Sequence, residues 1–111
     1  MLYRENRIRK NFEFSYIYRK SRKITTDYFI LYVLNKGDNV KVGFSVSRKN
    51  IGKAVQRNKI KRRLSEIIRL RCYCLKPVKM IIQPKCKIQD LSYKDTEKFL
   101  DNTFKKYNLY I

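Results

Sequence analysis

The chain has no histidine and no tryptophan, and only nine of its 111 residues are aspartate or glutamate. Without an imidazole, a Ser-His or Cys-His catalytic pair and a histidine-bound zinc site are excluded. A metal-dependent nuclease needs two or three carboxylates that converge on its ions, whereas these acidic residues are scattered singly. Only three glycines are present, and they form no phosphate-binding loop motif. The sequence therefore predicts a binding protein with no catalytic residue of its own.

Long hydrophobic segments are also missing, since the longest apolar run is the seven residues Tyr28 to Leu34. A run of that length cannot cross a bilayer. The first ten residues carry charges with no apolar segment after them, so we expect no signal peptide and a cytoplasmic protein. Cys72, Cys74 and Cys86 are odd in number, and the Cys72–Cys74 spacing does not match zinc ribbons. We expect half-buried small residues near a helix end rather than a metal site or a disulfide.

Lysine and arginine dominate the charged residues of the chain. The 28 lysines and arginines give a formal net charge of +19, which points to a polyanion as partner, either nucleic acid or an anionic membrane surface. At 43% apolar residues the chain is too hydrophobic for a disordered basic tail. Its length suits one hydrophobic core, so we expect residues 1–111 to form a single domain.

The apolar pattern predicts the order α-β-β-α-β-α, an α/β (α+β) two-layer sandwich on one small mixed sheet. We expect a short helix capped by Asn11, a strand at 28–34 that forms a hairpin with a strand at 41–47 across a turn at 35–39, a long helix at 53–74, a strand at 78–83 and a last helix capped by Ser92.

The long helix carries the strongest functional signal. Ile60, Leu64 and Ile67, with Ile68, form one apolar stripe, and cations cover most of the rest. Like charges four residues apart repel each other, and Glu66 is the only acidic residue in the segment. A solvated basic face is the alternative, but a helix selected for stability would intersperse glutamates. We therefore expect a helix that follows phosphates, extended by the hydroxyls and cations of residues 45–50.

Aromatic residues make up 14% of the chain and several lie beside basic ones. Phe14 and Tyr18 share a face of the first helix, and Tyr32 lies in the first strand. Single-stranded nucleic acids need stacking platforms of this kind, so a cleft lined by these three rings would hold an unpaired strand. The alternative is that the rings belong to the hydrophobic core.

Residues 42–64 resemble the signature of the bacterial ribonuclease P protein family, in which a G-x-[ST]-[VA]-[SA]-[KR]-K strand end leads into A-x-x-R-N-R-x-K-R on the long helix. The likeness extends from residues 6–11 through 29–32 to the last helix. Lys59 departs from the pattern, because it replaces the second arginine and loses the bidentate fork of a guanidinium.

The resemblance implies a non-catalytic subunit of a ribonucleoprotein that removes the 5′ leader of precursor tRNA, with hydrolysis carried by the catalytic RNA and its Mg²⁺ ions. It implies a left-handed βαβ crossover, against the usual hand. It also implies that Phe14, Tyr18 and Tyr32 line the leader cleft. The sequence holds no recognisable motif for a cofactor or a metal ion, and Mg²⁺ is expected in the holoenzyme. The residues implied to bind the catalytic RNA are Arg48, Lys49, Arg57, Asn58, Lys59, Lys61, Arg62 and Arg63.

Two other functions compete with this one. A ribosomal or architectural nucleic-acid-binding protein would have similar charge and size, but would not carry the motif. An autonomous nuclease would need the carboxylate cluster that the sequence lacks. Neither a membrane nor a protein partner is predicted.

Overall fold

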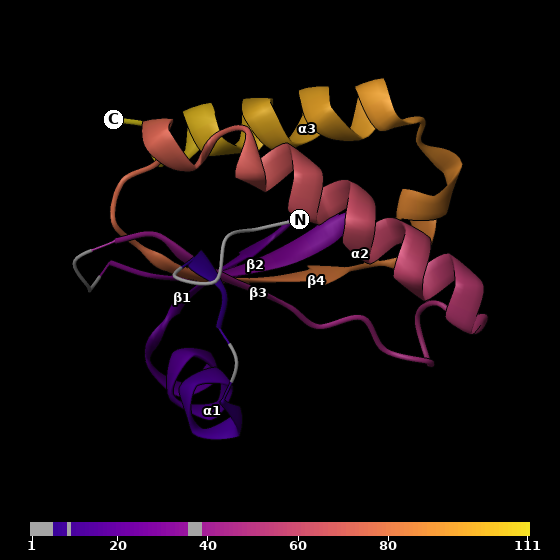
Figure 1. Ribbon diagram of the computed structural model, residues 1–111, viewed down its shortest axis with the longest axis horizontal. Coiled ribbons are helices and arrows are strands. Elements are labelled where there is room, and N and C mark those ends of the chain that lie inside the picture. Colours follow the sequence, from indigo (N-terminus) through magenta and orange to yellow (C-terminus); the bar gives the residue numbers. More distant parts are fainter. Residues whose placement is uncertain (1–5, 9, 36–38) are drawn as a thin grey trace.

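The computed structural model describes residues 6–8, 10–35 and 39–111 (Figure 1). Its elements, in chain order, are α1 (Asn11–Lys20), β1 (Arg22–Thr25), β2 (Phe29–Leu34), β3 (Lys41–Phe44), α2 (Ala54–Arg69), the short 3₁₀ helix η2 (Cys72–Cys74), β4 (Lys79–Pro84), a second 3₁₀ helix η3 (Cys86–Asp90) and α3 (Tyr93–Lys106). The mixed α+β class expected from the sequence is confirmed, with one strand more than predicted.

The four strands form one mixed sheet in the order β1-β2-β4-β3. β2 pairs antiparallel with both β1 and β4, and β3 pairs parallel with β4. The predicted hairpin between 28–34 and 41–47 is therefore wrong, because β4 lies between these two strands. The hairpin partner of β2 is β1, which the sequence pattern did not predict. Residues 36–38 of the expected turn lie outside the described residues.

Burial explains this strand order. Met80, Ile81 and Ile82 of β4 are fully buried, so both faces of that strand need cover and it takes a central place in the sheet. β1 has a single buried residue, Ile24, between exposed positions. A short strand with charged side chains such as Arg22 and Lys23 suits the edge, where it discourages pairing with another chain.

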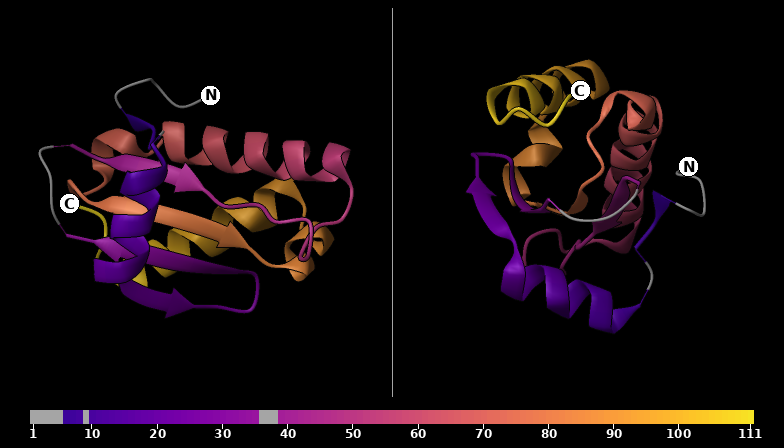
Figure 2. Two further views of the ribbon diagram at one scale, coloured as in Figure 1. Left: turned by 90° about the horizontal axis from the view of Figure 1, so that it is seen from below. Right: turned by 90° about the vertical axis from the view of Figure 1, so that its left-hand side faces the viewer.

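The connection from β3 through α2 to β4 is left-handed. In Figure 2 (left), β3 and β4 point the same way, β4 lies below β3, and α2 lies behind the sheet. A chain that runs along β3, returns behind the sheet through α2 and enters β4 on that side makes a left-handed turn. The expectation drawn from the family resemblance is confirmed. Nearly all crossovers between parallel strands are right-handed, so this left-handed crossover is a distinguishing feature of the fold.

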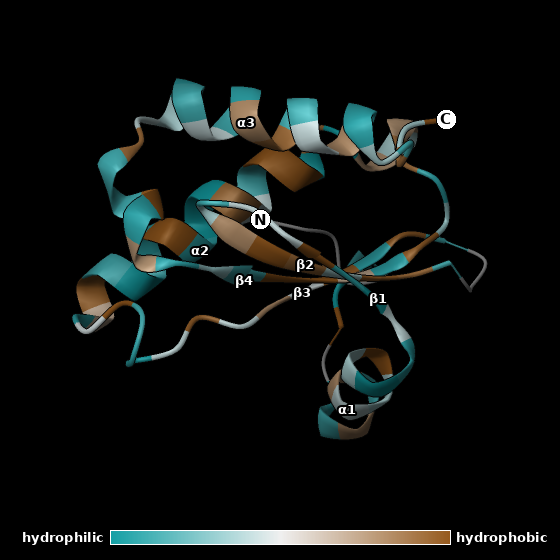
Figure 3. Cartoon of the chain, turned by 180° about the vertical axis from the view of Figure 1, so that it is seen from behind, coloured by the Kyte–Doolittle hydropathy of each residue, from teal (hydrophilic) through white to brown (hydrophobic). Residues whose placement is uncertain are grey.

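Two layers make up the body of the molecule. The sheet is covered on one face by α2 and α3, whose apolar surfaces face it (Figures 1 and 3). Leu64 and Ile67 of α2, together with Leu100 and Phe104 of α3, are completely buried there. On the other face α1 crosses the strands near one end (Figure 2), and Ile8 packs there beside Ile17.

The helix boundaries agree with the sequence patterns except at some ends. The Ser92 hydroxyl accepts a hydrogen bond from the Asp95 N–H at 3.1 Å, which confirms the predicted cap of α3. The cap of α1 is Lys10 and not Asn11, which is the first helical residue. The long helix ends at Arg69, short of the predicted Cys74, because the chain turns there into η2 and then bridges to Tyr110.

Candidate nucleic-acid interface

The outward side of α2 is a basic face, made of Asn58, Lys59, Lys61 and Arg62, which are all exposed. It exists because the apolar stripe of the helix is buried: Ile60 keeps 5% of its surface exposed and Leu64, Ile67 and Ile68 keep none. Asn58, Lys61 and Arg62 also line a shallow hollow together with Ser65. The predicted cations and the amide are thus brought together on one solvent-facing surface.

Arg57 and Arg63 stand apart from the basic face, because each is hydrogen-bonded to backbone within the protein. One guanidinium nitrogen of Arg57 donates to the carbonyl oxygens of Ile51 and Gly52, at 3.0 and 2.8 Å. A guanidinium nitrogen of Arg63 donates to the Leu91 carbonyl at 3.4 Å. Arg57 therefore fastens the loop before α2, and Arg63 ties α2 to the segment before α3.

The loop between β3 and α2 presents Arg48 and Lys49, which are both exposed. A turn holds this loop in place: the Asn50 N–H donates to the Ser47 hydroxyl at 3.2 Å and the Ile51 N–H to the Ser47 carbonyl at 3.0 Å. Ile51 is completely buried and anchors the loop in the core. The two cations are thus held on an ordered turn that leads into the basic face.

Among the residues that the structure describes, no carboxylate forms an ion pair with Lys59, Lys61 or Arg62 of the basic face. Glu66 is the one carboxylate in α2, and it is hydrogen-bonded and paired with Arg69. The Arg69 guanidinium lowers the pKa of Glu66 to about 2, so the carboxylate stays charged, and the positive charge of Arg69 balances it. Lys59, Lys61 and Arg62 keep their positive potential toward solvent.

The second surface lies on the opposite face of the sheet, where α1 packs. The strand registers place Lys23, Tyr32, Ile81 and Gly43 in one row across the sheet. Ile17 of α1 is completely buried against this face with Ile8 and Ile81. The Phe14 ring lies so close to Gly43 that a Cβ there would stand 2.7 Å from the ring.

We call Phe14, Tyr18 and Tyr32 the aromatic surface. The rings of Tyr18 and Tyr32 meet edge to face, with centroids 4.7 Å apart. Tyr18 keeps 38% of its surface exposed, while Phe14 and Tyr32 are half-buried. The structure thus brings together the three aromatic residues that the sequence singled out, and they are only partly in the core.

Polar groups complete the aromatic surface. The Tyr32 hydroxyl donates to Oε1 of Gln83 at 3.4 Å, and Nζ of Lys23 stands 6.0 Å from the Tyr32 ring centroid. A base stacked on these rings would have a cation for its phosphate and an amide for its edge within reach. Lys23, Gln83 and, on α2, Ser65 were absent from the predicted sites. Strand alternation would have indicated Lys23, had β1 been recognised.

The cysteines form no site. Cys72 and Cys74 are half-buried in η2, Cys86 is exposed in η3, and all three are free thiols. Burial raises the pKa of Cys72, which leaves its thiol protonated and a poor metal ligand. Across the described residues no three cysteine, aspartate or glutamate side chains gather as metal ligands would. Within that same part of the chain no helix is long and apolar enough to span a membrane.

Comparisons with known proteins agree with this geometry. Residues 2–108 match the family model described as Ribonuclease P. Curated ribonuclease P protein components from Bacillus velezensis and Finegoldia magna are 36% and 39% identical to the chain, over 96% and 90% of its length and 93% and 88% of theirs.

Solved structures give the same result. The ribonuclease P protein of Staphylococcus aureus superposes with a TM-score of 0.87 at 29% identity, covering 96% of this chain and 98% of that one. The Thermotoga maritima protein gives a TM-score of 0.79 at 25% identity, covering 90% and 96%.

Proposed function

The chain belongs to the ribonuclease P protein family, and from that premise we propose that it holds the catalytic RNA on the basic face of α2 and the single-stranded 5′ leader of precursor tRNA on the aromatic surface. It is the protein subunit of an endoribonuclease that acts in tRNA 5′ processing, and its partner is the ribonuclease P RNA. Residues 1–111 would act as one RNA-binding domain, in the cytoplasm.

The observation that carries the proposal is the separation of two chemically different surfaces by the sheet. Lys59, Lys61 and Arg62 offer positive charge, with no stacking partner on their own helix face. Such a face suits the phosphates of a folded RNA, whose bases are already paired. Arg48 and Lys49 extend it, while Arg57 and Arg63 contribute chiefly by holding the adjoining backbone.

The aromatic surface suits an unpaired strand. Base stacking on Tyr18 and Tyr32 is indifferent to sequence, as a leader that differs from one precursor to the next requires. Lys23 adds charge for the strand's phosphates beside the ring of Tyr32. A mature tRNA has no leader and would leave this surface empty.

The hydrolytic step is assigned to the RNA and its Mg²⁺ ions. The scattered acidic residues of this chain support that assignment, because a phosphodiester hydrolase built on protein needs convergent carboxylates. The chain's contribution is binding: it neutralises phosphates of the catalytic RNA and positions the leader. The neutralisation of phosphates matters most when Mg²⁺ is scarce, since the protein then supplies countercharge that the ions do not.

Reconstitution tests the proposal. Adding the protein to its cognate catalytic RNA at low Mg²⁺ should raise cleavage of precursor tRNA well above that of the RNA alone. The protein without RNA should give no cleavage at any Mg²⁺ concentration. Turnover by an RNA-free preparation would reassign the chemistry to the protein. Failure to stimulate, with equal affinity for an unrelated structured RNA, would favour the architectural alternative.

A further inference from the structure

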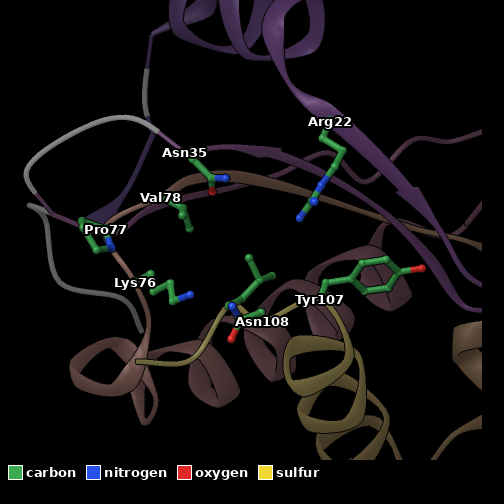
Figure 4. A pocket seen from close by; sticks show the side chains of 8 residues that line it. Arg22, Asn35, Lys76, Pro77, Val78, Tyr107 and Asn108 are labelled. Atoms are coloured by element: carbon green, nitrogen blue, oxygen red, sulfur yellow. The ribbon is translucent and has the colours of Figure 1, made fainter.

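A hollow of about 540 Å³ lies on the side of the sheet covered by α3, away from α1 (Figure 4). Arg22 at the start of β1 and Asn35 after β2 form one side of it. Lys76 and Val78, just before β4, form another, and Tyr107 and Asn108 close it where α3 ends. No residue of the basic face or the aromatic surface takes part.

The polar groups of the hollow suit an anion. The side chains of Arg22, Lys76 and Asn35 point into it (Figure 4), and Asn108 lies at its margin. Among the described residues that line it, none is acidic. The guanidinium carbon of Arg22 also stands 6.0 Å from the Tyr107 ring centroid, a contact that orients the cation.

Backbone hydrogen bonds hold the lining residues in place. The Lys76 N–H donates to the Leu109 carbonyl at 2.9 Å, and the Leu109 N–H donates to the Phe104 carbonyl at 2.8 Å. Between them Asn108 adopts the left-handed conformation, with φ 58°, which asparagine tolerates better than most residues. The site is thus built into the turn that ends α3, so little ordering is needed when a ligand enters.

The remaining wall is apolar, formed by the exposed Pro77 and, at its base, by Val78 and Leu109, which each keep 2% of their surface exposed. A phosphate ion alone would leave that wall unused. We propose that the hollow binds a phosphorylated nucleotide, with its phosphate between Arg22 and Lys76 and its base against the apolar wall. The nucleotide would be either a free mononucleotide or the 5′-phosphorylated end of an RNA.

Titration of the full-length protein with adenosine monophosphate, followed by NMR of the backbone amides, tests the site. Shifts should gather at the amides of residues 22, 35, 76, 78 and 107–109. Arg22→Gln and Lys76→Gln should each weaken binding about tenfold or more, because each removes a charge-assisted hydrogen bond. Lys98→Gln, which removes one exposed cation from α3, is the matched control and should bind as the wild type does.

Three further probes identify the ligand. Adenosine and inorganic phosphate should each bind much more weakly than adenosine monophosphate. Comparing an RNA trimer with and without a 5′-phosphate separates the two sources: a preference for the phosphorylated trimer over the mononucleotide assigns the site to an RNA end, and the reverse to a free nucleotide. Phosphate binding as tightly as the nucleotide, shifts confined to α2 or α1, or equal weakening by Lys98→Gln would overturn the proposal.

Discussion

Tyr18 is the most exposed ring of the aromatic surface, and its edge-to-face contact with Tyr32 keeps it in place. Tyr18→Ala should weaken binding of precursor tRNA to the holoenzyme by about 1–3 kcal/mol, the range for one lost base stack. Binding of leaderless tRNA and assembly with the catalytic RNA should be nearly unchanged. Phe12→Ala is the control, because Phe12 is 67% exposed on the same helix but lies outside the aromatic surface.

Equal losses for both tRNAs, accompanied by a lower melting temperature, would contradict this prediction. That outcome would mean that Tyr18 acts as a core residue, whose truncation costs about 3–5 kcal/mol of folding stability. Measuring the two affinities beside one melting curve separates the two roles.

Gly43 sets how closely α1 approaches the sheet. An alanine Cβ would stand 2.7 and 2.8 Å from two ring atoms of Phe14, which is closer than carbon atoms pack. Gly43→Ala should therefore displace the Phe14 ring, lower folding stability by about 1–3 kcal/mol and weaken leader binding, without altering assembly. The free energy of unfolding and the leader-dependent affinity measure these effects.

Gly52→Ala is the matched control for that substitution. A Cβ at Gly52 meets only the Arg48 carbonyl oxygen, at 4.0 Å, which is an ordinary contact. If Gly43→Ala left Phe14 and leader affinity as they are, the close packing of α1 on the sheet would not matter to the leader.

At the scale of a whole element, α2 presents its charges as a group. Binding to the catalytic RNA should weaken steeply with salt, because each neutralised phosphate releases counterions. Arg62→Ala should flatten the slope of log affinity against log salt by about 0.7–0.9, the contribution of one phosphate. Lys98→Ala on α3 should leave the slope as it is, and an unchanged slope in Arg62→Ala would show that Arg62 is only solvated.

The elements could be predicted from sequence wherever periodicity and burial agree. The stripe of α2 and the capped start of α3 are clear because their apolar spacing is helical over several turns. β1 was missed because Ile24 is its only buried residue. The false hairpin arose because consecutive strands usually pair, whereas here β4, with its buried residues Met80, Ile81 and Ile82, lies between β2 and β3.

The candidate site divides in the same way. The exposure of Lys61 and Arg62 follows from the helical period, as does the shared face of Phe14 and Tyr18. The basic face and the aromatic surface could therefore both be outlined from the sequence. The bonds of Arg57 to the loop and of Arg63 to Leu91 depend on where those backbone segments lie in space. Helical periodicity places a side chain on one face of its helix. It does not identify the backbone carbonyl of a neighbouring segment to which that side chain donates a hydrogen bond.

At the scale of the whole molecule, an ionic cluster joins the segment between α2 and η2 to α3. The Arg71 guanidinium donates to Asp101, with one contact at 2.9 Å, and stands 3.2 Å from Glu97. Tyr110 donates its hydroxyl to Asp101 as well. Arg71 lowers the pKa of Asp101, so the stabilisation is present above the unfolded carboxyl value of about 3.9 and is lost as the pH falls through the folded one.

The melting temperature should therefore be flat near neutrality and fall below about pH 4. Asp101→Asn should lower the free energy of unfolding at pH 7 by about 1–2 kcal/mol, since the pair is partly screened by solvent, and should reduce the fall in acid. Asp90→Asn, at an exposed position in η3, should keep the wild-type profile. An acid profile unchanged by Asp101→Asn would assign the acid sensitivity to other carboxylates.

The place of β4 in the sheet has a consequence for synthesis. It is the last strand to leave the ribosome, yet it alone pairs with both β2 and β3. Until it emerges, β3 has, among the described residues, only the isolated bridge between Arg7 and Val42, and the apolar stripe of α2 has no complete sheet to cover it. A nascent chain that stops before Lys79 would expose that stripe beside a dense run of cations, and RNA would meet the basic segment before the fold exists. Folding of the sheet must therefore wait until β4 has been synthesised, as the non-local pairing of β3 with β4 requires.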